Sequence, residues 1–344
     1  MIHRISRGKL ADLAVGIGCL MLLHGWALLA LYFWFVSQPV AALLVALGYA
    51  AILVLILRFA RSKPHAGWTS LVLFLVVAVW WTRRKAETGL DYPRETEQAA
   101  RFEREGNFLT VHAMRDFRYR TPTDFEARWS TRTFDLDQLE AVDLFFSNWG
   151  IPAVDHVITS FVFRDQPPLA VSIELRAETD EPNTLLRGFF KQYELFYVWA
   201  DERDLVNLRT TARGEQVSLF RTSLSPETGR RLLTEMAARS EALEVNPEFY
   251  NTLTDNCTNV IARHVNHLMD RPLPWYRRPV RTGKYVRLGY DGGWLVHTRP
   301  WEEFRSASLI NERARSAAGD ADFSRQIRTH LPIPEPAIEQ YPSN

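Results

Sequence analysis

The stretch Asn251–His264, NTLTDNCTNVIARH, holds the only cysteine of this chain that lies outside an apolar segment. Its polar first half, in which Asp255 or Thr254 can serve as a helix N-cap, gives way to apolar residues at helical spacing. The pattern predicts that Cys257 lies in the first turn of a helix, where unpaired backbone N–H groups and the helix dipole favour a thiolate. A reactive thiol is one interpretation. A structural cysteine is the other, because free cysteines are commonly buried and inert.

The composition is that of a protein with a membrane part and a soluble part. The chain has 344 residues, a net charge of +1 and 47% hydrophobic residues, and most of its long apolar runs precede Trp81. The near-zero net charge gives no reason to expect a nucleic-acid partner. Cys19 lies inside an apolar run, so a disulfide with Cys257 is not expected. An unpaired cysteine in an exported domain indicates a reactive thiol.

Three apolar runs predict a membrane anchor of about three transmembrane helices within residues 1–82. The runs are Ala11–Val36, Val40–Leu57 and Trp68–Trp81, of which the last is only marginally long enough to span. Basic residues precede the first run and fill the loop Arg58–Lys63, which places both segments on the cytoplasmic side. Three crossings then deliver the rest of the chain to the opposite side of the membrane.

The rest of the chain is interpreted as a charged linker over residues 83–107, an α+β domain over 108–300 and a C-terminal tail over 301–344. Patterns of alternating apolar residues predict strands over 108–114, 117–119, 125–129, 131–136, 156–163, 169–176, 204–210 and 216–221. Helical patterns and helix-start signals predict a helix or a helical turn over 137–144, and helices over 185–198, 226 to about 243, and after Cys257.

Two of these strands, 156–163 and 169–176, predict a β-hairpin. A register symmetric about the connecting loop pairs Phe163 with Leu169. Because side chains alternate along a strand, one face then carries four polar residues, which are His156, Ser160, Ser172 and Glu174. The histidine and the glutamate would lie one diagonal step apart on adjacent strands. The alternative is a solvent-exposed polar face with an incidental ion pair.

Cysteine catalysis needs a thiolate nucleophile, a histidine that moves the proton and a third polar group that orients the imidazole ring. Cys257, His156 and Glu174 fill these three roles in the preferred interpretation. Ser172 or Asn256 can replace Glu174 as the orienting group.

His264 is the rival base. It follows Cys257 by seven positions, and a helix rises about 10 Å over that distance, which is too far for direct contact. Asp255, beside Asn256, is a further supporting residue of the motif. His156 is therefore preferred as the base.

Metal and cofactor sites have little support in the sequence. His264 and His267 have a spacing at which two histidines can bind a metal ion, but a solvated helix face is the favoured interpretation. No glycine-rich phosphate loop is present, and no cofactor or metal is expected. The basic and aromatic stretch Trp275–Lys284 is either a contact for anionic lipid or an exposed loop without a ligand.

At these residues the chain resembles a known family, the Lnb N-terminal periplasmic domain. The resemblance covers roughly Phe108–Leu268, and the membrane segment and the tail lie outside it. The phrases that carry it are Arg115–Tyr119 (RDFRY), Asp124-Phe125, Trp129, His156, Ser160-Phe161, Ser172–Arg176 (SIELR), Arg187–Phe190 (RGFF), Gln192–Leu195 (QYEL), Ala200–Asp204 (ADERD) and Asp255–Thr258 (DNCT).

The resemblance implies a multi-pass protein of a bacterial inner membrane with a periplasmic catalytic domain. It implies a permuted papain-like (NlpC-type) fold. It also implies an acyltransferase that moves a fatty acyl chain from a phospholipid, through a thioester on Cys257, to the amine of an envelope lipoprotein. His156 would be the base and Glu174 the orienting group. Two alternatives stay open: an envelope cysteine hydrolase that cuts peptidoglycan or a lipid amide, and a non-enzymatic scaffold with an inert Cys257.

Overall fold

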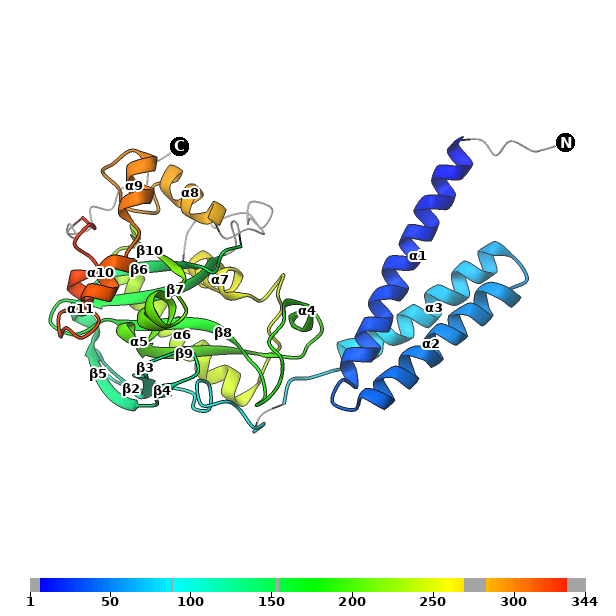
Figure 1. Cartoon of the computed structure of the whole chain (residues 1–344), viewed down its shortest axis with the longest axis horizontal. Helices are drawn as coiled ribbons and strands as arrows, with labels where there is room; N and C mark the ends of the chain where they lie inside the picture. The colour runs from blue at the N-terminus through cyan, green and yellow to red at the C-terminus, as the bar shows by residue number, and fades with distance from the viewer. Residues whose placement is uncertain (1–6, 88, 152–154, 269–282, 333–344) are drawn as a thin grey trace. The chain divides into compact units, whose positions relative to one another are not determined.

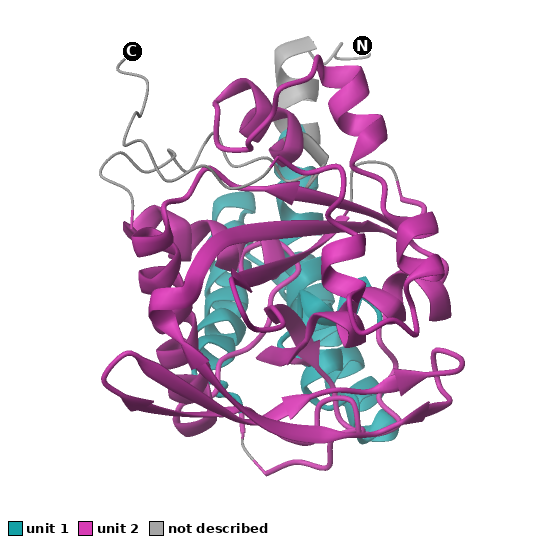
Figure 2. Ribbon diagram, turned by 90° about the vertical axis from the view of Figure 1, so that its left-hand side faces the viewer, with its two compact units in different colours: residues 1–86, 184–192 teal, residues 87–183, 193–344 magenta. Residues whose placement is uncertain are grey.

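The computed structural model describes residues 7–87, 89–151, 155–268 and 283–332. The chain divides into two compact units, which are coloured separately in Figure 2. The first unit comprises residues 1–86 and 184–192, and the second comprises residues 87–183 and 193–344. Each unit is described by itself.

Three long helices form most of the first unit: α1 (Arg7–Trp34), α2 (Pro39–Phe59) and α3 (Lys63–Thr82), labelled in Figure 1. All three are long and apolar enough to cross a membrane, as the sequence predicts. The third run reaches this length because α3 begins five residues before Trp68, at a helix start in which the Ser62 side chain accepts a hydrogen bond from the backbone N–H of His65.

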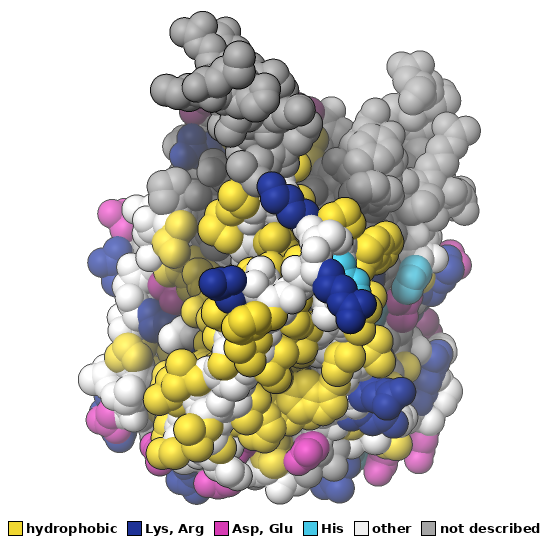
Figure 3. Space-filling model, turned by 90° about the vertical axis from the view of Figure 1, so that its right-hand side faces the viewer, with side chains coloured by type: hydrophobic (Ala, Val, Ile, Leu, Met, Phe, Trp, Pro, Cys, Tyr) yellow, Lys and Arg dark blue, Asp and Glu magenta, His cyan; other side chains and the backbone are white. Residues whose placement is uncertain are grey.

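The surface of these helices is apolar. At most 22% of the residues in each spanning segment are buried inside the protein, so most of their aliphatic and aromatic side chains face outward. Leu22, Val40 and Trp68, for example, are each more than two thirds exposed. Figure 3 shows a face over which such hydrophobic side chains predominate. An apolar surface of this extent is what a lipid bilayer covers.

A short segment from far along the sequence completes the first unit. It contains the single-turn helix α4 (Leu185–Gly188). The Phe190 ring stacks on Phe33 at 5.0 Å and lies edge-on to Trp81 at 6.1 Å. Lys191 Nζ donates to the backbone carbonyl of Trp81 over 3.0 Å. The segment therefore packs against the C-terminal ends of α1 and α3, the two ends that three crossings place on the same side of the membrane.

The second unit is built on an eight-stranded sheet with the order β1-β2-β9-β8-β7-β6-β10, in which β5 also pairs with β2. All pairings are antiparallel except that of β2 with β9. The strands are β1 (Arg101–Glu105), β2 (Phe108–Arg115), β5 (Trp129–Asp135), β6 (Leu139–Asn148), β7 (Asp155–Phe163), β8 (Leu169–Arg176), β9 (Glu194–Asp201) and β10 (Gln216–Arg221). Strands β3 (Arg118–Tyr119) and β4 (Phe125–Glu126) form a separate small hairpin.

Helices cover both faces of this sheet and bury two apolar clusters. Against one face pack α6 (Pro226–Val245), α7 (Cys257–Leu268), α8 (Gly283–Asp291) and α9 (Trp301–Ala307). Against the other pack α5 (Glu202–Asn207), the π-helical turn η2 (Leu208–Ala212), α10 (Asn311–Ser316) and α11 (Phe323–Gln326). The mixed α+β class predicted from the sequence is confirmed.

Three segments differ from their predicted secondary structure, and in each of them most residues are buried. The helix predicted over 185–198 is helical only in the single turn α4, and its last five residues belong to strand β9, whose residues are nearly all buried. The helix or helical turn predicted over 137–144 is the 3₁₀ turn η1 (Leu136–Gln138) followed by β6, which is buried in the same way. A short apolar run without alternation does not distinguish a buried strand from a buried helix.

The strand predicted over 204–210 is instead α5 and the turn η2. Asp201 caps α5 by accepting a hydrogen bond from the backbone N–H of Arg203 over 3.0 Å. Asp204 is fully buried and pairs with Arg115 Nη2 over 2.8 Å. The strand prediction assumed that apolar residues of this segment alternate with exposed polar ones. Asp204 is instead buried in an ion pair, so the alternation does not indicate a strand here.

The predicted linker and tail also contain parts of the folded domain. The linker ends in β1, which pairs along its whole length with β2. The tail supplies α9, α10 and α11, and its residues Ile310, Ala314 and Phe323 lie in the apolar cluster beside α5. Single apolar residues scattered among charged ones gave no periodic signal for these contacts.

Candidate functional site

The helix α7 begins at Cys257, which confirms the prediction that this cysteine lies in a first helical turn. The N-cap is Asn256, whose Oδ1 accepts a hydrogen bond from the backbone N–H of Asn259 over 2.9 Å, and not Asp255 or Thr254 as predicted. Asp255 instead pairs with Arg263 over 2.8 Å. Asn256 and Asp255 therefore shape the loop that presents Cys257.

The strands β7 and β8 form the predicted hairpin in a different register. Leu169 pairs with Phe161 and not with Phe163. Phe163 lies within β7 and pairs with Leu139 of β6 on the other side of the strand. Because the shift is two residues, the faces of both strands stay as predicted. If this register is extended beyond the pair Ile158–Ser172, His156 lies directly opposite Glu174.

A compact network links the polar side chains on that face. His156 Nε2 lies 2.6 Å from Ser172 Oγ and 3.2 Å from Glu174 Oε1. Ser172 donates its hydroxyl hydrogen to Glu174 Oε1 over 2.6 Å. Since a serine has only one hydrogen to give, the His156 ring must donate from Nε2 to Ser172. Nδ1 is then the ring nitrogen that remains for a proton from another group.

That other group is Cys257, whose side chain lies close enough to His156 for each to shift the pKa of the other. The thiol is 8% exposed and also receives a hydrogen bond from the backbone N–H of Val157. The pairing of β7 with β8 ends at Ile158–Ser172, and α7 packs against both strands. The cysteine belongs to the α6–α7 side of the sheet, and it meets the histidine just beyond the point where this pairing ends.

Charge separation at this site favours a thiolate and an imidazolium. Burial opposes the charged ring of His156, but the Glu174 carboxylate and the neighbouring thiolate together raise the His156 pKa to about 9. Burial likewise opposes a charged sulfur, and the adjacent His156 outweighs it, so the pKa of Cys257 is lowered. Both shifts prepare the sulfur to act as a nucleophile.

Arg209 is a member of this network that the sequence interpretation missed. Its guanidinium is buried, and Nη2 donates to Glu174 Oε1 over 2.6 Å. It lies on the π-helical turn η2, in a segment that was predicted to be a strand. Nothing in the local sequence distinguishes it from the many surface arginines. Irregular turns of this kind are frequent at functional sites.

The two other histidines considered from the sequence do not contact Cys257. His264 is buried, with Nε2 2.7 Å from the Tyr197 hydroxyl and Nδ1 2.8 Å from Glu235 Oε1. His267 is exposed and lies 3.1 Å from the same carboxylate. Among the described residues no group of three or more His, Cys, Asp or Glu side chains is arranged to hold a metal ion. The side chains of most of Trp275–Lys284 fall outside the described part of the chain.

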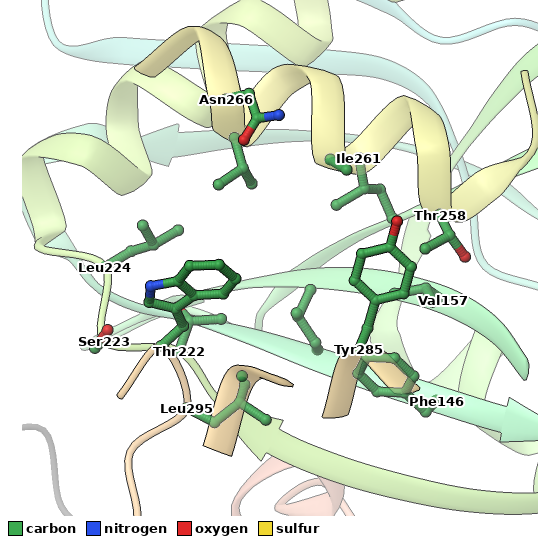
Figure 4. A pocket seen from close by; sticks show the side chains of 15 residues that line it. Phe146, Val157, Thr222, Ser223, Leu224, Thr258, Ile261, Asn266, Tyr285 and Leu295 are labelled. Atoms are coloured by element: carbon green, nitrogen blue, oxygen red, sulfur yellow. The ribbon is translucent and has the colours of Figure 1, made fainter. Parts of the chain in front are cut away.

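Figure 4 shows an apolar pocket whose lining includes the residues that follow the histidine and the cysteine in the sequence. Two of its lining residues, Val157 and Thr258, directly follow His156 and Cys257 in the sequence. Thr258 Oγ1 lies 3.7 Å from Cys257 Sγ. The wall is completed by side chains from β6, α7, α8 and the loops around Leu224 and Leu295.

Comparison with known proteins supports the resemblance noted in the sequence. Residues 125–286 match the family model of the Lnb N-terminal periplasmic domain, a range that includes His156, Glu174, Arg209 and Cys257. No curated protein and no solved structure matches the chain. The predicted family is therefore confirmed: the chain carries an Lnb N-terminal periplasmic domain, behind three helices able to anchor it in a membrane.

Proposed function

We propose that this protein is a membrane-anchored periplasmic acyltransferase that carries a fatty acyl chain as a thioester on Cys257. The observation that supports it is the contact of Cys257, at the first residue of a helix, with a histidine that is itself held by Glu174 and Ser172. A nucleophile, a base and an orienting group in contact are the elements of covalent acyl transfer.

In the first half-reaction His156 Nδ1 holds the thiol proton, and the Cys257 sulfur attacks the carbonyl carbon of a phospholipid ester. The new carbon–sulfur bond forms, the ester carbon–oxygen bond breaks, and His156 gives its proton to the departing lysophospholipid oxygen. In the second half-reaction a lipoprotein amine attacks the thioester, and His156 takes the amine proton. Cys257 leaves and recovers the proton. The product is an amide, and no oxidant or reductant is needed.

The arrangement of the domain is compatible with a permuted papain-like (NlpC-type) fold. In this chain the histidine precedes the cysteine, His156 lies on an antiparallel strand, and Cys257 opens a helix that packs on the same sheet. We include this fold assignment in the proposal, since it groups the domain with proteins that form acyl–cysteine intermediates.

The test is the intact mass of the full-length protein in detergent after incubation with phosphatidylethanolamine. We expect the mass of wild type to rise by one acyl chain and to return to its original value on treatment with hydroxylamine, which cleaves thioesters. Cys257→Ala should show no adduct. Cys19→Ala is the matched control, because it removes the only other cysteine, and it should acylate as wild type does.

A second incubation with a diacylated lipopeptide that bears a free α-amino group separates the possible reactions. Transfer gives an N-acylated peptide, whereas a hydrolase gives free fatty acid and leaves the amine unchanged. Absence of any adduct on wild type with every phospholipid tested would overturn the proposal in favour of a scaffold or of a hydrolase with another substrate.

A further inference from the structure

The pocket beside Cys257 has the location, direction and chemistry of a binding site for one hydrocarbon chain. Its near end lies at the nucleophile, because Thr258 Oγ1 is 3.7 Å from Cys257 Sγ and Val157 follows the histidine on β7. Cys257 itself does not line the pocket, but an acyl group bound to its sulfur would lie next to the end formed by Thr258 and Val157.

The pocket runs along α7, away from the cysteine. Its α7 lining consists of Thr258, Ile261, Ala262, Val265 and Asn266. These positions are spaced by three and four residues and share one face of the helix, which rises about 12 Å from the first to the last. Figure 4 shows Thr258 and Val157 toward one end of the pocket and Leu224 and Asn266 toward the other.

The lining suits a chain of methylene groups more than a sugar or a peptide. Opposite α7 the wall consists of Leu144 and Phe146 from β6, together with Trp294 and Leu295. Sites for polar ligands place several converging hydrogen-bonding groups around the ligand, whereas the surface here is mostly aliphatic and aromatic; its polar side chains are Thr222, Ser223, Thr258, Asn266 and the Tyr285 hydroxyl. A fatty acyl chain gains free energy by burial against such a surface.

We propose that this pocket receives the acyl chain that Cys257 carries, and that Ala262 and Val265 on α7 set the length of chain it accepts. The inference rests on the proposed function. Ala262 is the small residue in the middle of the α7 lining, one turn beyond Thr258, so a larger side chain there shortens the pocket. Val265 lies a further turn along, so a smaller side chain there lengthens it.

The test offers the full-length protein an equimolar mixture of phosphatidylethanolamines with octanoyl and palmitoyl chains, and reads the two adduct masses on Cys257. We expect Ala262→Phe to lower the ratio of palmitoyl to octanoyl adduct about tenfold or more, the factor that corresponds to the lost contacts of about two methylene groups. We expect Val265→Ala to raise the same ratio. The matched control is Ala238→Phe, the same substitution at an exposed position of α6 that lies outside the pocket.

The outcomes separate this inference from the proposed function. A wild-type protein that forms no thioester overturns the proposed function and the inference together. A wild-type protein that forms thioesters, with both pocket variants giving its chain ratio, overturns only the assignment of the pocket. If Ala262→Phe prevents folding, Val265→Ala alone decides, because it removes atoms and introduces no clash.

Discussion

Arg209 Nη2 donates a hydrogen bond to Glu174 Oε1 over 2.6 Å, although the two residues lie on a turn and a strand far apart in the sequence. The same oxygen accepts the Ser172 hydroxyl and lies 3.2 Å from His156 Nε2. One carboxylate oxygen, Glu174 Oε1, thus contacts a guanidinium, a hydroxyl and an imidazole. The orientation of the histidine depends on all of these contacts.

Replacing Arg209 with methionine should therefore slow acylation of Cys257 about tenfold or more, the effect expected from losing a buried charged hydrogen bond. The guanidinium also lowers the His156 pKa against the opposite effect of Glu174, so its removal should move the alkaline limit of the reaction to higher pH. A purely structural role would lower the rate without moving the pH profile. Arg209→Lys retains the charge and should keep the alkaline limit near that of wild type.

Variants of His156, on β7, and of His264, on α7, form a matched pair. His156→Gln should reduce acylation by a factor on the order of 10² to 10⁴, the usual contribution of a general base. His264→Gln should acylate at close to the wild-type rate, since His264 contacts Tyr197 and Glu235 and not the cysteine. The measurement is the initial rate of adduct formation by mass spectrometry. Equal losses in both variants would contradict the assignment of His156.

The pH dependence of Cys257 follows from the two shifted pKa values. The thiolate forms as the pH rises through a Cys257 pKa below its ordinary value, so alkylation by iodoacetamide in a Cys19→Ala background should reach its plateau at a lower pH than in His156→Gln. Acyl transfer also needs the protonated histidine, which loses its proton as the pH rises through about 9. Transfer should therefore fall above that pH while alkylation does not. A transfer rate that still rises beyond pH 9 would exclude His156 as the acid.

The sequence predicted the parts of this site that local patterns encode. The start of a helix at Cys257 follows from a polar cluster before an amphipathic run, and the common face of His156 and Glu174 follows from the two-residue period of a strand. The predicted face is correct although the predicted register is wrong, because the register differs by two residues and such a shift keeps each side chain on the same face. These features depend only on residues that are close together in the sequence, so they can be predicted from one sequence.

The missing parts depend on contacts between distant segments. Arg209 meets Glu174 only because α5 packs against β8 and continues directly into η2, and no local pattern records that contact. Strand β9 and helix α5 were misassigned because burial on both faces and a buried ion pair hide the period that distinguishes strand from helix. The pocket near Cys257 combines walls from five separate segments and has no sequence signature.

The direction of the membrane helices can be tested at their connecting loops. The basic loops predict that Ser62, before α3, is cytoplasmic and that Ser37, between α1 and α2, is periplasmic. In a background without Cys19 and Cys257, a membrane-impermeant maleimide added to intact cells should label Ser37→Cys and leave Ser62→Cys unlabelled until the membrane is opened. The reverse pattern would place the domain that follows α3 in the cytoplasm.

The last described helix of the chain should matter for stability, although it lies in the predicted tail. Arg328 follows α11, and its guanidinium donates to Asp143 Oδ2 over 2.8 Å and to Glu202 Oε1 over 2.7 Å. Both carboxylates are completely buried. Arg328→Ala removes a cation from two buried anions, and such a change typically costs about 3–5 kcal/mol of the free energy of unfolding.

Arg325→Ala is the control for this prediction, because Arg325 lies one turn earlier and is 80% exposed in a surface pair with Asp322. Exposed pairs contribute little, so this variant should unfold at nearly the same urea concentration as wild type. The comparison uses the full chain in detergent, with tryptophan fluorescence as the signal. If Arg328→Ala also unfolds with wild type, its carboxylate partners must be hydrated or protonated, and the tail would then be held by its apolar contacts alone. A large loss confined to Arg328→Ala would instead show that these buried ion pairs help to hold the tail on the domain that contains the Cys257 site, because Asp143 and Glu202 belong to the strand and helix beside β7 and β9.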